Sequence, residues 1–245
     1  AKPGDLVFFK GCPLRCKWCA NPEGLERKFQ IMLKPTACVS CGACVAVCPQ
    51  HIHSITANGE HLINRAIDCI GCGSCVRACM QSALKVAGEQ VPVSDLLTYL
   101  EEDRVFYEQS GGGVTLSGGE VTSQPEAAIN LLEACKREGL HTAIETCGYA
   151  KKDVLLRFAE VVDLFLFDIK HMDPERHAEL TGVRNEMILD NLETLLQRRH
   201  NVKVRMPLLK GINDSEPEIR AVIDFLTPYK DLKNFKGIDL LPYHK

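Results

Sequence analysis

The sequence predicts an α/β fold, a partial (β/α)6 TIM-type barrel into which a small cysteine-rich domain is inserted. Two observations lead to this prediction. First, segments with the hydrophobic period of a strand alternate with segments that have the period of a helix, and such alternation is typical of a parallel sheet. Second, one cysteine-rich segment contains the same motif twice, 31 residues apart, which indicates an internal duplication.

The barrel is predicted from six strands and the helices between them. Setting aside the insert at 34–87 leaves 1–33 and 88–245 for the barrel, enough for six units of about 31 residues each. The strands are expected at Leu6–Lys10, Val114–Ser117, His141–Glu145, Leu164–Asp168, Val202–Met206 and Ile238–Leu241. The helices are expected to begin with a serine cap at Ser94 and to span Glu126–Glu138, Lys151–Ala159, Glu186–Arg199 and Glu216–Leu226.

The composition is that of an ordinary globular protein. Of the 245 residues, 45% are hydrophobic and 25% are charged. The net charge of −3 gives no reason to expect a nucleic-acid partner. No apolar run approaches the roughly 20 residues of a membrane span, and Ala1–Asp5 does not open a signal peptide. We therefore expect a cytoplasmic protein without a nucleic-acid or membrane partner.

Cysteine is the unusual residue. Eleven of the thirteen cysteines form three tight groups between Cys12 and Cys79. The cytosol keeps thiols reduced, so disulfides explain these groups poorly, and the close spacing favours metal binding. Of the other two, Cys135 lies on the apolar stripe of a predicted helix and is interpreted as a core residue. Cys147 has no partner at ligand spacing and receives no role.

The duplicated motif has the spacing C-x2-C-x2-C-x3-C. This is the run of bacterial ferredoxins, in which the fourth cysteine binds the other cluster. It predicts two crossed [4Fe–4S] sites in a domain that needs its metal to fold; a zinc ribbon is the alternative. The first site is expected to use Cys38, Cys41, Cys44 and Cys79, and the second Cys69, Cys72, Cys75 and Cys48.

Other polar residues are interpreted as having no role in binding or catalysis. Eight cysteines suffice for two clusters, so His51, His53 and His61 are expected at the surface. The run at 101–104 is interpreted as a solvated helix face. The first motif ends in the usual Pro49 and the second in Met80, a difference that affects the loop rather than the ligands.

A third cysteine group, C-x3-C-x2-C, follows the first predicted strand at Cys12, Cys16 and Cys19. In a parallel barrel the loops after the strands form the active face. Three thiolates can hold three irons of a [4Fe–4S] cluster and leave the fourth iron without a protein ligand, as a catalytic metal requires. A zinc site or three unrelated thiols are the alternatives, and the two neighbouring cluster motifs favour iron and sulfur.

This loop, with the aromatic Trp18 before its third cysteine, resembles the signature of the radical S-adenosylmethionine (SAM) superfamily. The resemblance implies catalytic roles for Cys12, Cys16 and Cys19, with the amino and carboxylate groups of SAM on the open iron. Trp18 would lie near the adenine. The family reductively cleaves SAM to methionine and a 5′-deoxyadenosyl radical.

A glycine pair ends the second predicted strand, in Gly118-Gly119-Glu120. Glycines let the backbone approach a ligand, and a carboxylate can accept from an ammonium group, although a lone glycine pair is more often only a turn. The segment resembles the family's Gly-Gly-Glu motif, which implies contacts with the SAM amino group. The family usually continues with proline, where this chain has Val121.

Polar residues end the later strands, where a barrel holds its substrate. Glu145, Asp168 and Lys170 resemble residues of the activating enzymes of glycyl radical enzymes that hold SAM and, in at least some members, a monovalent cation; Thr146 is a weaker candidate. A salt bridge between Asp168 and Lys170, or helix caps, are the alternatives. Arg205 and His244 complete the expected SAM site. A purely structural role is the alternative for Arg205.

The resemblance to these activating enzymes spans essentially the whole chain. Segments that carry it include Phe9–Leu14, Cys19–Glu23, Ser110–Glu120, Asp168–Met172 and Leu241–His244. The pyruvate formate-lyase activator looks similar but lacks the eight-cysteine insert, whereas activators of choline lyase and glycerol dehydratase carry it. The family usually extends further at both ends, so we expect that this sequence lacks the ends of a longer chain.

The resemblance implies three [4Fe–4S] clusters, SAM, and a glycyl radical enzyme as protein substrate. The 5′-deoxyadenosyl radical would take a hydrogen from a backbone glycine of that partner. A flavodoxin or ferredoxin would donate electrons, and an anaerobic bacterium is the expected source. Two alternatives stay open at this point: a radical SAM enzyme that acts on a small molecule or another protein residue, and an electron carrier whose barrel only binds SAM.

Overall fold

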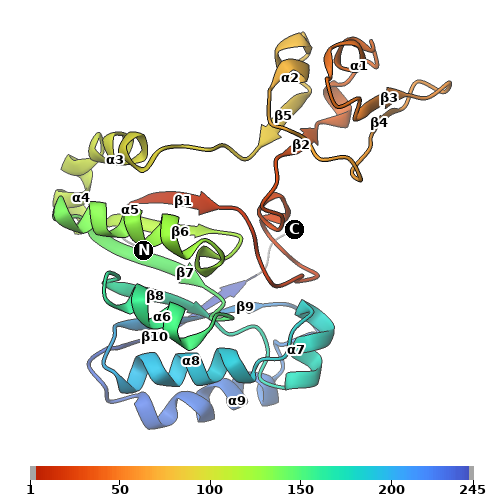
Figure 1. The fold of residues 1–245 in the computed structure, drawn as a ribbon. Helices are drawn as coiled ribbons and strands as arrows, with labels where there is room; N and C mark the ends of the chain where they lie inside the picture. The colour runs from red at the N-terminus through yellow and green to blue at the C-terminus, as the bar shows by residue number, and fades with distance from the viewer. Residues whose placement is uncertain (1–3, 243–245) are drawn as a thin grey trace. The chain divides into compact units, whose positions relative to one another are not determined.

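A computed structural model describes residues 4–242, which form two compact units (Figure 1). One unit contains the described residues of Ala1–Leu25 and Pro92–Lys245, and the other is Glu26–Val91. The second unit is therefore somewhat longer at both ends than the predicted insert at 34–87. In the described part of the chain, no helix combines the length and apolar character needed to cross a membrane.

The larger unit is built on one six-stranded parallel sheet. Its strands follow one another in chain order, as in a (β/α) barrel and unlike a doubly wound sheet. The first and last strands lie at the two edges, so this barrel is open. The predicted parallel α/β fold is confirmed. The strands are β1 (Asp5–Phe9), β6 (Gly113–Gly118), β7 (His141–Thr146), β8 (Leu164–Asp168), β9 (Val202–Leu208) and β10 (Phe235–Pro242).

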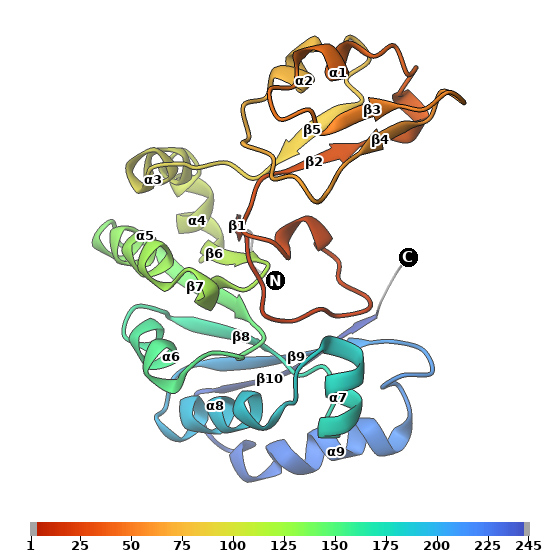
Figure 2. The ribbon, with the colours of Figure 1, turned by 45° about the vertical axis from the view of Figure 1, so that its right-hand side comes forward.

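One row of side chains shows how the sheet is held. Leu116, Ile144, Phe165 and Val202 are register partners on four successive strands, and each is fully buried. They form part of the main core under the helices, which lie along one side of the sheet (Figures 1 and 2). Because side chains alternate along a strand, the neighbouring residues face away from these helices.

The helices begin and end at recognisable signals. Pro125 occupies the first turn of α5, and Gly139, with a φ of +73°, follows its end. Asp173 caps α7 by accepting a hydrogen bond from the Arg176 amide at 2.8 Å. The α-helices of this unit are α3 (Val93–Glu101), α4 (Arg104–Ser110), α5 (Pro125–Arg137), α6 (Lys152–Ala159), α7 (Pro174–Thr181), α8 (Glu186–Gln197) and α9 (Glu216–Leu226).

The predicted serine cap at Ser94 is wrong. Pro92 occupies the N-cap position of α3, and Ser94 lies inside the helix, where its hydroxyl donates to Asp95 at 3.0 Å. The run at 101–104 joins the end of α3 to the start of α4. The described residues also form short 3-10 helices, of which η2 belongs to the smaller unit: η1 (Pro22–Gly24), η2 (Pro35–Ala37), η3 (Val121–Ser123) and η4 (Thr227–Tyr229).

The smaller unit repeats one local structure. Gly42 and Gly73, both in the left-handed region with φ of +76° and +68°, precede two five-residue helices, which contain Cys44 and Cys75. Two antiparallel pairs complete the unit, β2 with β5 and β3 with β4. The elements are β2 (Gln30–Leu33), α1 (Ala43–Val47), β3 (His53–Ile55), β4 (His61–Ile63), α2 (Ser74–Ala78) and β5 (Leu84–Ala87).

Candidate functional site

The three-cysteine loop leaves the carboxyl end of β1 and is fixed by its own backbone. The amide of Gly11 donates to the Gly24 carbonyl at 2.7 Å, and that of Cys12 donates to the Leu25 carbonyl at 3.0 Å. These bonds tie the start of the loop to the segment that follows it.

The middle of the loop is held by the end of α7. Arg15 donates its amide to the Thr181 carbonyl at 2.6 Å, and Lys17 donates to the Leu180 carbonyl at 3.0 Å. Carbonyls at the end of a helix lack partners within that helix, so the loop satisfies them. Helix α7, which was not among the helices expected from the sequence, therefore supports the cysteine loop.

The three thiols are half-buried in this loop. Burial raises the pKa of Cys12 to about 11 and raises that of Cys16, while the nearby ammonium group of Lys170 acts in the opposite direction on both. Thiols of this kind become ligands when a metal displaces their protons. Three clustered thiols with a half-buried aromatic neighbour, Trp18, are a donor set that fits an iron–sulfur cluster.

The glycine turn after β6 packs directly on the start of this loop. Gly119 donates its amide to the Phe9 carbonyl at 2.8 Å, and Glu120 donates to the Gly11 carbonyl at 2.8 Å. A Cβ on Gly118, whose φ is +109°, would lie 2.3 Å from the Phe9 oxygen, and one on Gly119 would lie 2.4 Å from the Gly24 oxygen. Only glycine fits at these two positions without displacement of the backbone.

The side chain of Glu120 is committed to protein donors. It is 2% exposed. Its Oε1 accepts from the amide and hydroxyl of Thr122 at 3.1 and 2.8 Å and from the hydroxyl of Thr146 at 2.8 Å, and its Oε2 accepts from the amide of Cys147 at 2.8 Å. The carboxylate thus joins the glycine turn to the end of β7.

A charge network lines the carboxyl ends of β6 to β9. Arg205 donates from Nε to Asp168 at 2.8 Å and also contacts Glu145. Ser117 donates to Glu145 at 2.6 Å, and Lys170 lies 3.2 Å from Asp168. The four charged side chains are between 12% and 27% exposed. The salt bridge between Asp168 and Lys170 that we considered as an alternative is therefore present.

The network keeps its cations charged despite burial. Burial, the largest single influence, lowers the pKa of Lys170, but the Asp168 carboxylate and the Cys16 and Cys147 sulfurs together hold that pKa above its usual value. Arg205 behaves in the same way between Asp168 and Glu145. Two carboxylates and two cations thus lie beside the cysteine loop. The ammonium and carboxylate groups of a bound amino acid could pair with them in place of their present partners.

Ser117 is the member of this network that the sequence reasoning missed. It stands one position before the glycine pair. Leu116 and Ile144 are register partners, so Ser117 and Glu145, the next residue on each strand, share the opposite face. Two other cysteines are fully buried: Cys135 lies in the core, as predicted, and Cys147 contacts Glu120. His244 lies outside the described residues.

In the smaller unit the two crossed sets of cysteines line two separate cavities. Cys38, Cys41, Cys44 and Cys79 line one of about 220 Å³. The other cavity is much tighter, and its lining includes Ile31, Ile52 and Ile70 beside the four cysteines of the other set, Cys48, Cys69, Cys72 and Cys75. Four converging thiols in each place are a donor set that fits a [4Fe–4S] cluster.

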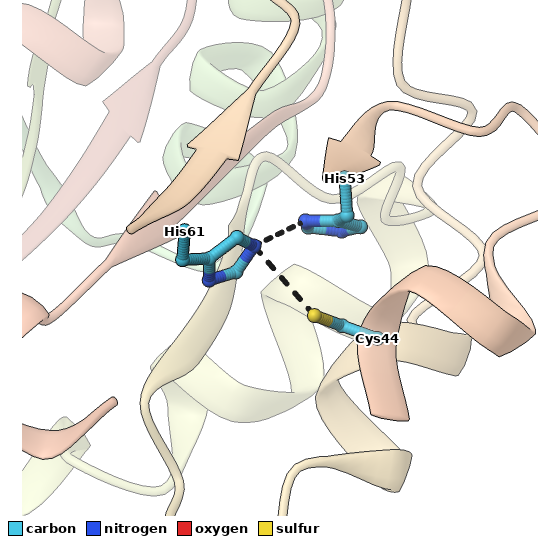
Figure 3. Close-up of side chains that lie close together, drawn as sticks. All are labelled: Cys44, His53 and His61. Carbon is cyan, nitrogen blue, oxygen red and sulfur yellow. Dashed lines mark hydrogen bonds between the residues drawn. The ribbon is translucent and has the colours of Figure 1, made fainter. Parts of the chain in front are cut away.

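A pair of neighbouring histidines lies beside Cys44 (Figure 3), and His61 of this pair belongs to the lining of the larger cavity. Nδ1 of His61 lies 3.5 Å from the Cys38 sulfur and its Nε2 lies 3.6 Å from the Cys44 sulfur. His53 is 3% exposed, and its Nδ1 lies 3.0 Å from Nε2 of His61. Burial lowers the pKa of both imidazoles. The expectation of a surface position is therefore wrong for His53, which is buried, whereas His61 is half-buried at the cavity and His51 is exposed, as predicted.

Comparison with known families gives two matches to family models. The chain matches the family model for the radical SAM superfamily over residues 69–223 and that for a 4Fe–4S dicluster domain over residues 37–84. A structure described as a domain of pyruvate-formate lyase-activating enzyme from Bacteroides vulgatus superposes with a TM-score of 0.51 at 34% identity, covering 55% of this chain and 82% of that one. SuiB of Streptococcus suis, at 21% identity and a TM-score of 0.52, over 63% of this chain and 34% of that one, shares the fold.

Full-length relatives are more similar. The choline trimethylamine-lyase activating enzyme of Oleidesulfovibrio alaskensis is 63% identical over 98% of this chain and 78% of that protein. The trans-4-hydroxy-L-proline dehydratase activating enzyme of Clostridioides difficile is 45% identical over the same shares. The benzylsuccinate synthase activating enzyme of Thauera aromatica is 38% identical over 97% of this chain and 72% of that protein. The chain therefore belongs to the radical SAM superfamily and, within it, to the activating enzymes of glycyl radical enzymes.

Proposed function

We propose that Cys12, Cys16 and Cys19 bind the [4Fe–4S] cluster at which this enzyme uses SAM. The observation that supports the proposal best is the hydrogen bond from the Glu120 amide to the Gly11 carbonyl, because it joins the cysteine loop to the glycine turn. When bound, the cluster supplies the electron that cleaves SAM to methionine and a 5′-deoxyadenosyl radical, which takes a hydrogen from a glycine of the partner enzyme.

The residues around the loop bind and orient SAM. Gly118 and Gly119 let their turn pack against the backbone of Phe9 and Gly24, and the backbone of this turn is the proposed neighbour of the SAM amino group. Glu120 acts by fixing the turn, since its carboxylate oxygens already accept four hydrogen bonds, and Thr146 supports it as one of those donors. Trp18 is the proposed neighbour of the adenine, and His244 keeps its proposed place near SAM.

The charge network provides both kinds of polar partner that SAM needs. Lys170 and Arg205 can pair with its carboxylate, while Glu145 and Asp168 can accept from its ammonium and hydroxyl groups. A monovalent cation bound at Glu145 and Asp168 would compete with Arg205, which contacts both.

We propose two further [4Fe–4S] clusters in the smaller unit, one in each cavity, within a ferredoxin-like core at 34–87. Four thiolates saturate a cubane, which suits electron transfer rather than substrate binding. A flavodoxin or ferredoxin is the proposed external electron donor. These assignments bring the total to three clusters, with all eleven grouped cysteines as ligands.

The partner that we propose is a glycyl radical enzyme of the choline lyase class, on the basis of the relative that is 63% identical. The test is anaerobic incubation of reconstituted enzyme with SAM, a reductant and either choline trimethylamine-lyase or hydroxyproline dehydratase. We expect 5′-deoxyadenosine with both and a glycyl radical signal in electron spin resonance with the lyase. A radical on the dehydratase alone would overturn the partner assignment.

Cys16→Ala tests the assignment of the reacting cluster in the same assay. It should abolish 5′-deoxyadenosine formation and lower the iron content by about one third of that of a three-cluster protein. The buried core variant Cys135→Ala is the matched control and should retain both. Full turnover by Cys16→Ala would show that the site lies elsewhere.

A further inference from the structure

A hairpin between the two halves of the duplication carries a pair of histidines. His53 on β3 has Ile63 as its register partner, and His61 on β4 has Ile55. The two histidines are therefore diagonal neighbours on one face of the hairpin. Their ring centroids lie 5.1 Å apart with the planes inclined at 46°. Ile55 and His61 on this face line the same cavity as Cys38, Cys41, Cys44 and Cys79.

The contacts select one arrangement of the imidazole protons. If His53 donates from Nδ1 to Nε2 of His61, then Nδ1 of His61 carries a proton and donates to the Cys38 sulfur at 3.5 Å. In the opposite arrangement, Nε2 of His53 would carry a proton. That atom is buried and has no hydrogen-bond partner among the described residues, and a buried donor without a partner is rarer than a buried acceptor without one. The first arrangement is therefore favoured; in it the Cys44 sulfur, 3.6 Å from Nε2 of His61, receives no hydrogen bond from this ring.

The other half of the duplication has no comparable pair. The second cavity is lined by Ile31, Ile52 and Ile70 beside its four cysteines, and no histidine of the described residues contributes to it. Ile31 comes from β2, which pairs with β5. Apolar side chains line both cavities, so two sites with the same cysteine spacing differ in that an imidazole, that of His61, lines only the first among the described residues.

We propose that His61, oriented by His53, donates a hydrogen bond to the Cys38 thiolate and thereby makes the first cluster of the smaller unit the more easily reduced of the two. This inference rests on the proposed function, because it requires a [4Fe–4S] cluster in each cavity. His61 and His53 are positioning residues for the cluster environment, and neither replaces a cysteine ligand.

The physical reason is the charge that reduction adds. One electron from an external one-electron donor converts the oxidised cluster to its reduced form, with no bond formed or broken and no proton transferred. The added negative charge spreads onto the thiolate sulfurs. A hydrogen bond to such a sulfur stabilises the reduced form more than the oxidised one, and hydrogen bonds to the sulfurs are a recognised determinant of cluster potential.

Direct binding of a lone metal ion is a weaker explanation of the same groups. Cys44, His53 and His61 offer ligand atoms that lie within 4.8 Å of one another, as a zinc site would. Such an ion would take Cys44 from the four thiols that line the cavity, and the matching run of the other half would then differ in function despite its identical cysteine spacing.

The test is a redox titration of the full chain monitored by electron spin resonance. Substitution of Cys12, Cys16 and Cys19 by Ala removes the third cluster, so that the titration reports the two clusters of the smaller unit. In this background we compare the parent protein with His61→Leu, which has no donor, and His61→Asn, whose amide can place an N–H near the position of Nδ1. His51→Asn, at an exposed residue whose φ of +50° asparagine tolerates, is the matched control.

We expect two one-electron components in the parent. His61→Leu should move the higher one to more negative potential, by roughly the 59 mV that corresponds to a tenfold change in the ratio of reduced to oxidised cluster. The lower component should stay in place. His61→Asn should restore most of the shift, and His51→Asn should leave both components unchanged. The iron content should be the same in all four proteins.

Several results would overturn the inference, and they are distinguishable. Two intact components that His61→Leu leaves in place, or an equal shift in His61→Asn, would show that the hydrogen bond does not set the potential. If His61→Leu fails to assemble its cluster, the titration is repeated with His53→Leu. No shift of the higher potential in His53→Leu would likewise show that the hydrogen bond does not set the potential. A parent with fewer than two titrating clusters would instead refute the two-cluster proposal on which the inference depends.

Discussion

Arg205 and Asp168 are register partners on adjacent strands, and the guanidinium of Arg205 donates to a carboxylate oxygen of Asp168 at 2.8 Å. Asp168 ends β8, and Arg205 lies at the middle of β9; both face away from the helices. Register partners on one face of a parallel sheet lie side by side. This pairing makes the charge network a direct consequence of strand register, and its side chains stand beside the cysteine loop that follows β1.

Removal of Arg205 should be costly because it leaves two carboxylates without their main partner. Arg205→Met is expected to destabilise the fold by about 3 kcal/mol, the usual cost of breaking a mostly buried ion pair, and to weaken SAM binding. Arg220→Met is the control, since its bond to Glu216 is exposed and should contribute less than about 1 kcal/mol. Thermal unfolding and SAM titration measure both. Equal effects of the two substitutions would contradict the role given to the network.

Glu120→Gln tests whether the Glu120 carboxylate fixes the glycine turn. The amide replaces one acceptor with a donor that faces other donors, so we expect a loss of about 2 kcal/mol of stability and at least roughly tenfold weaker SAM binding. The exposed Glu133 on α5 supplies the control, Glu133→Gln, which should change neither property. A Glu120→Gln protein that unfolds like the wild type would show that these hydrogen bonds are not important.

The effect of close packing at Gly118 can be distinguished from the effect of a positive φ alone. Gly118→Ala and Gly139→Ala both place a side chain at positive φ, which costs about 1 kcal/mol. A Cβ at Gly118 also meets the Phe9 backbone, whereas one at Gly139 meets nothing within 4 Å. We therefore expect a clearly larger fall of the unfolding midpoint for Gly118→Ala, together with loss of SAM binding. Comparable behaviour of the two variants would contradict the close packing of the turn on β1.

His177 should make stability depend on pH. It is buried in α7, where burial lowers its pKa below the usual value. Below pH 6.5 the unfolded chain takes up a proton at this residue that the folded chain does not, so the stability linked to His177 is complete above pH 6.5 and falls as the pH drops below it. The difference in unfolding midpoint between wild type and His177→Gln should therefore shrink from pH 7.5 toward acid.

A control variant distinguishes titration from packing in that experiment. Asn191→Ala removes a buried amide that donates to the Gly148 and Ala150 carbonyls at 2.8 Å and leaves the imidazole of His177 and its contacts in place. Its destabilisation should be nearly the same at every pH. A difference between wild type and His177→Gln that stays constant from neutral to acid pH would show that His177 does not titrate during unfolding.

The strands of the larger unit could be predicted because their hydrophobic patterns are long and regular. The predicted Leu164–Asp168 coincides with β8. Glu145, Asp168 and Arg205 meet because they lie on one face of the neighbouring parallel strands β7, β8 and β9. The short α7 was missed because it carries few apolar residues, although Asp173 followed by Pro174 is a recognisable helix start. Ser94 was misread because Pro92 already fixes the backbone at the start of α3.

The finer features of both sites depend on tertiary contacts. No sequence pattern shows that the Glu120 carboxylate is saturated by donors from Thr122, Thr146 and Cys147. The strands that carry His53 and His61 have three residues each, too few for a reliable hydrophobic period. The even spacing between the two histidines across a hairpin was the available signal that both could share one face.

The central claim is that the cluster bound by Cys12, Cys16 and Cys19 has one iron without a protein ligand, where SAM binds. Mössbauer spectroscopy of the anaerobically reconstituted enzyme, with and without SAM, tests it most directly. We predict that SAM changes the spectrum of a single iron site, and that Cys16→Ala abolishes this change while the signals of the eight-cysteine unit remain. A spectrum that SAM leaves unaltered in the fully loaded wild-type enzyme would contradict the account.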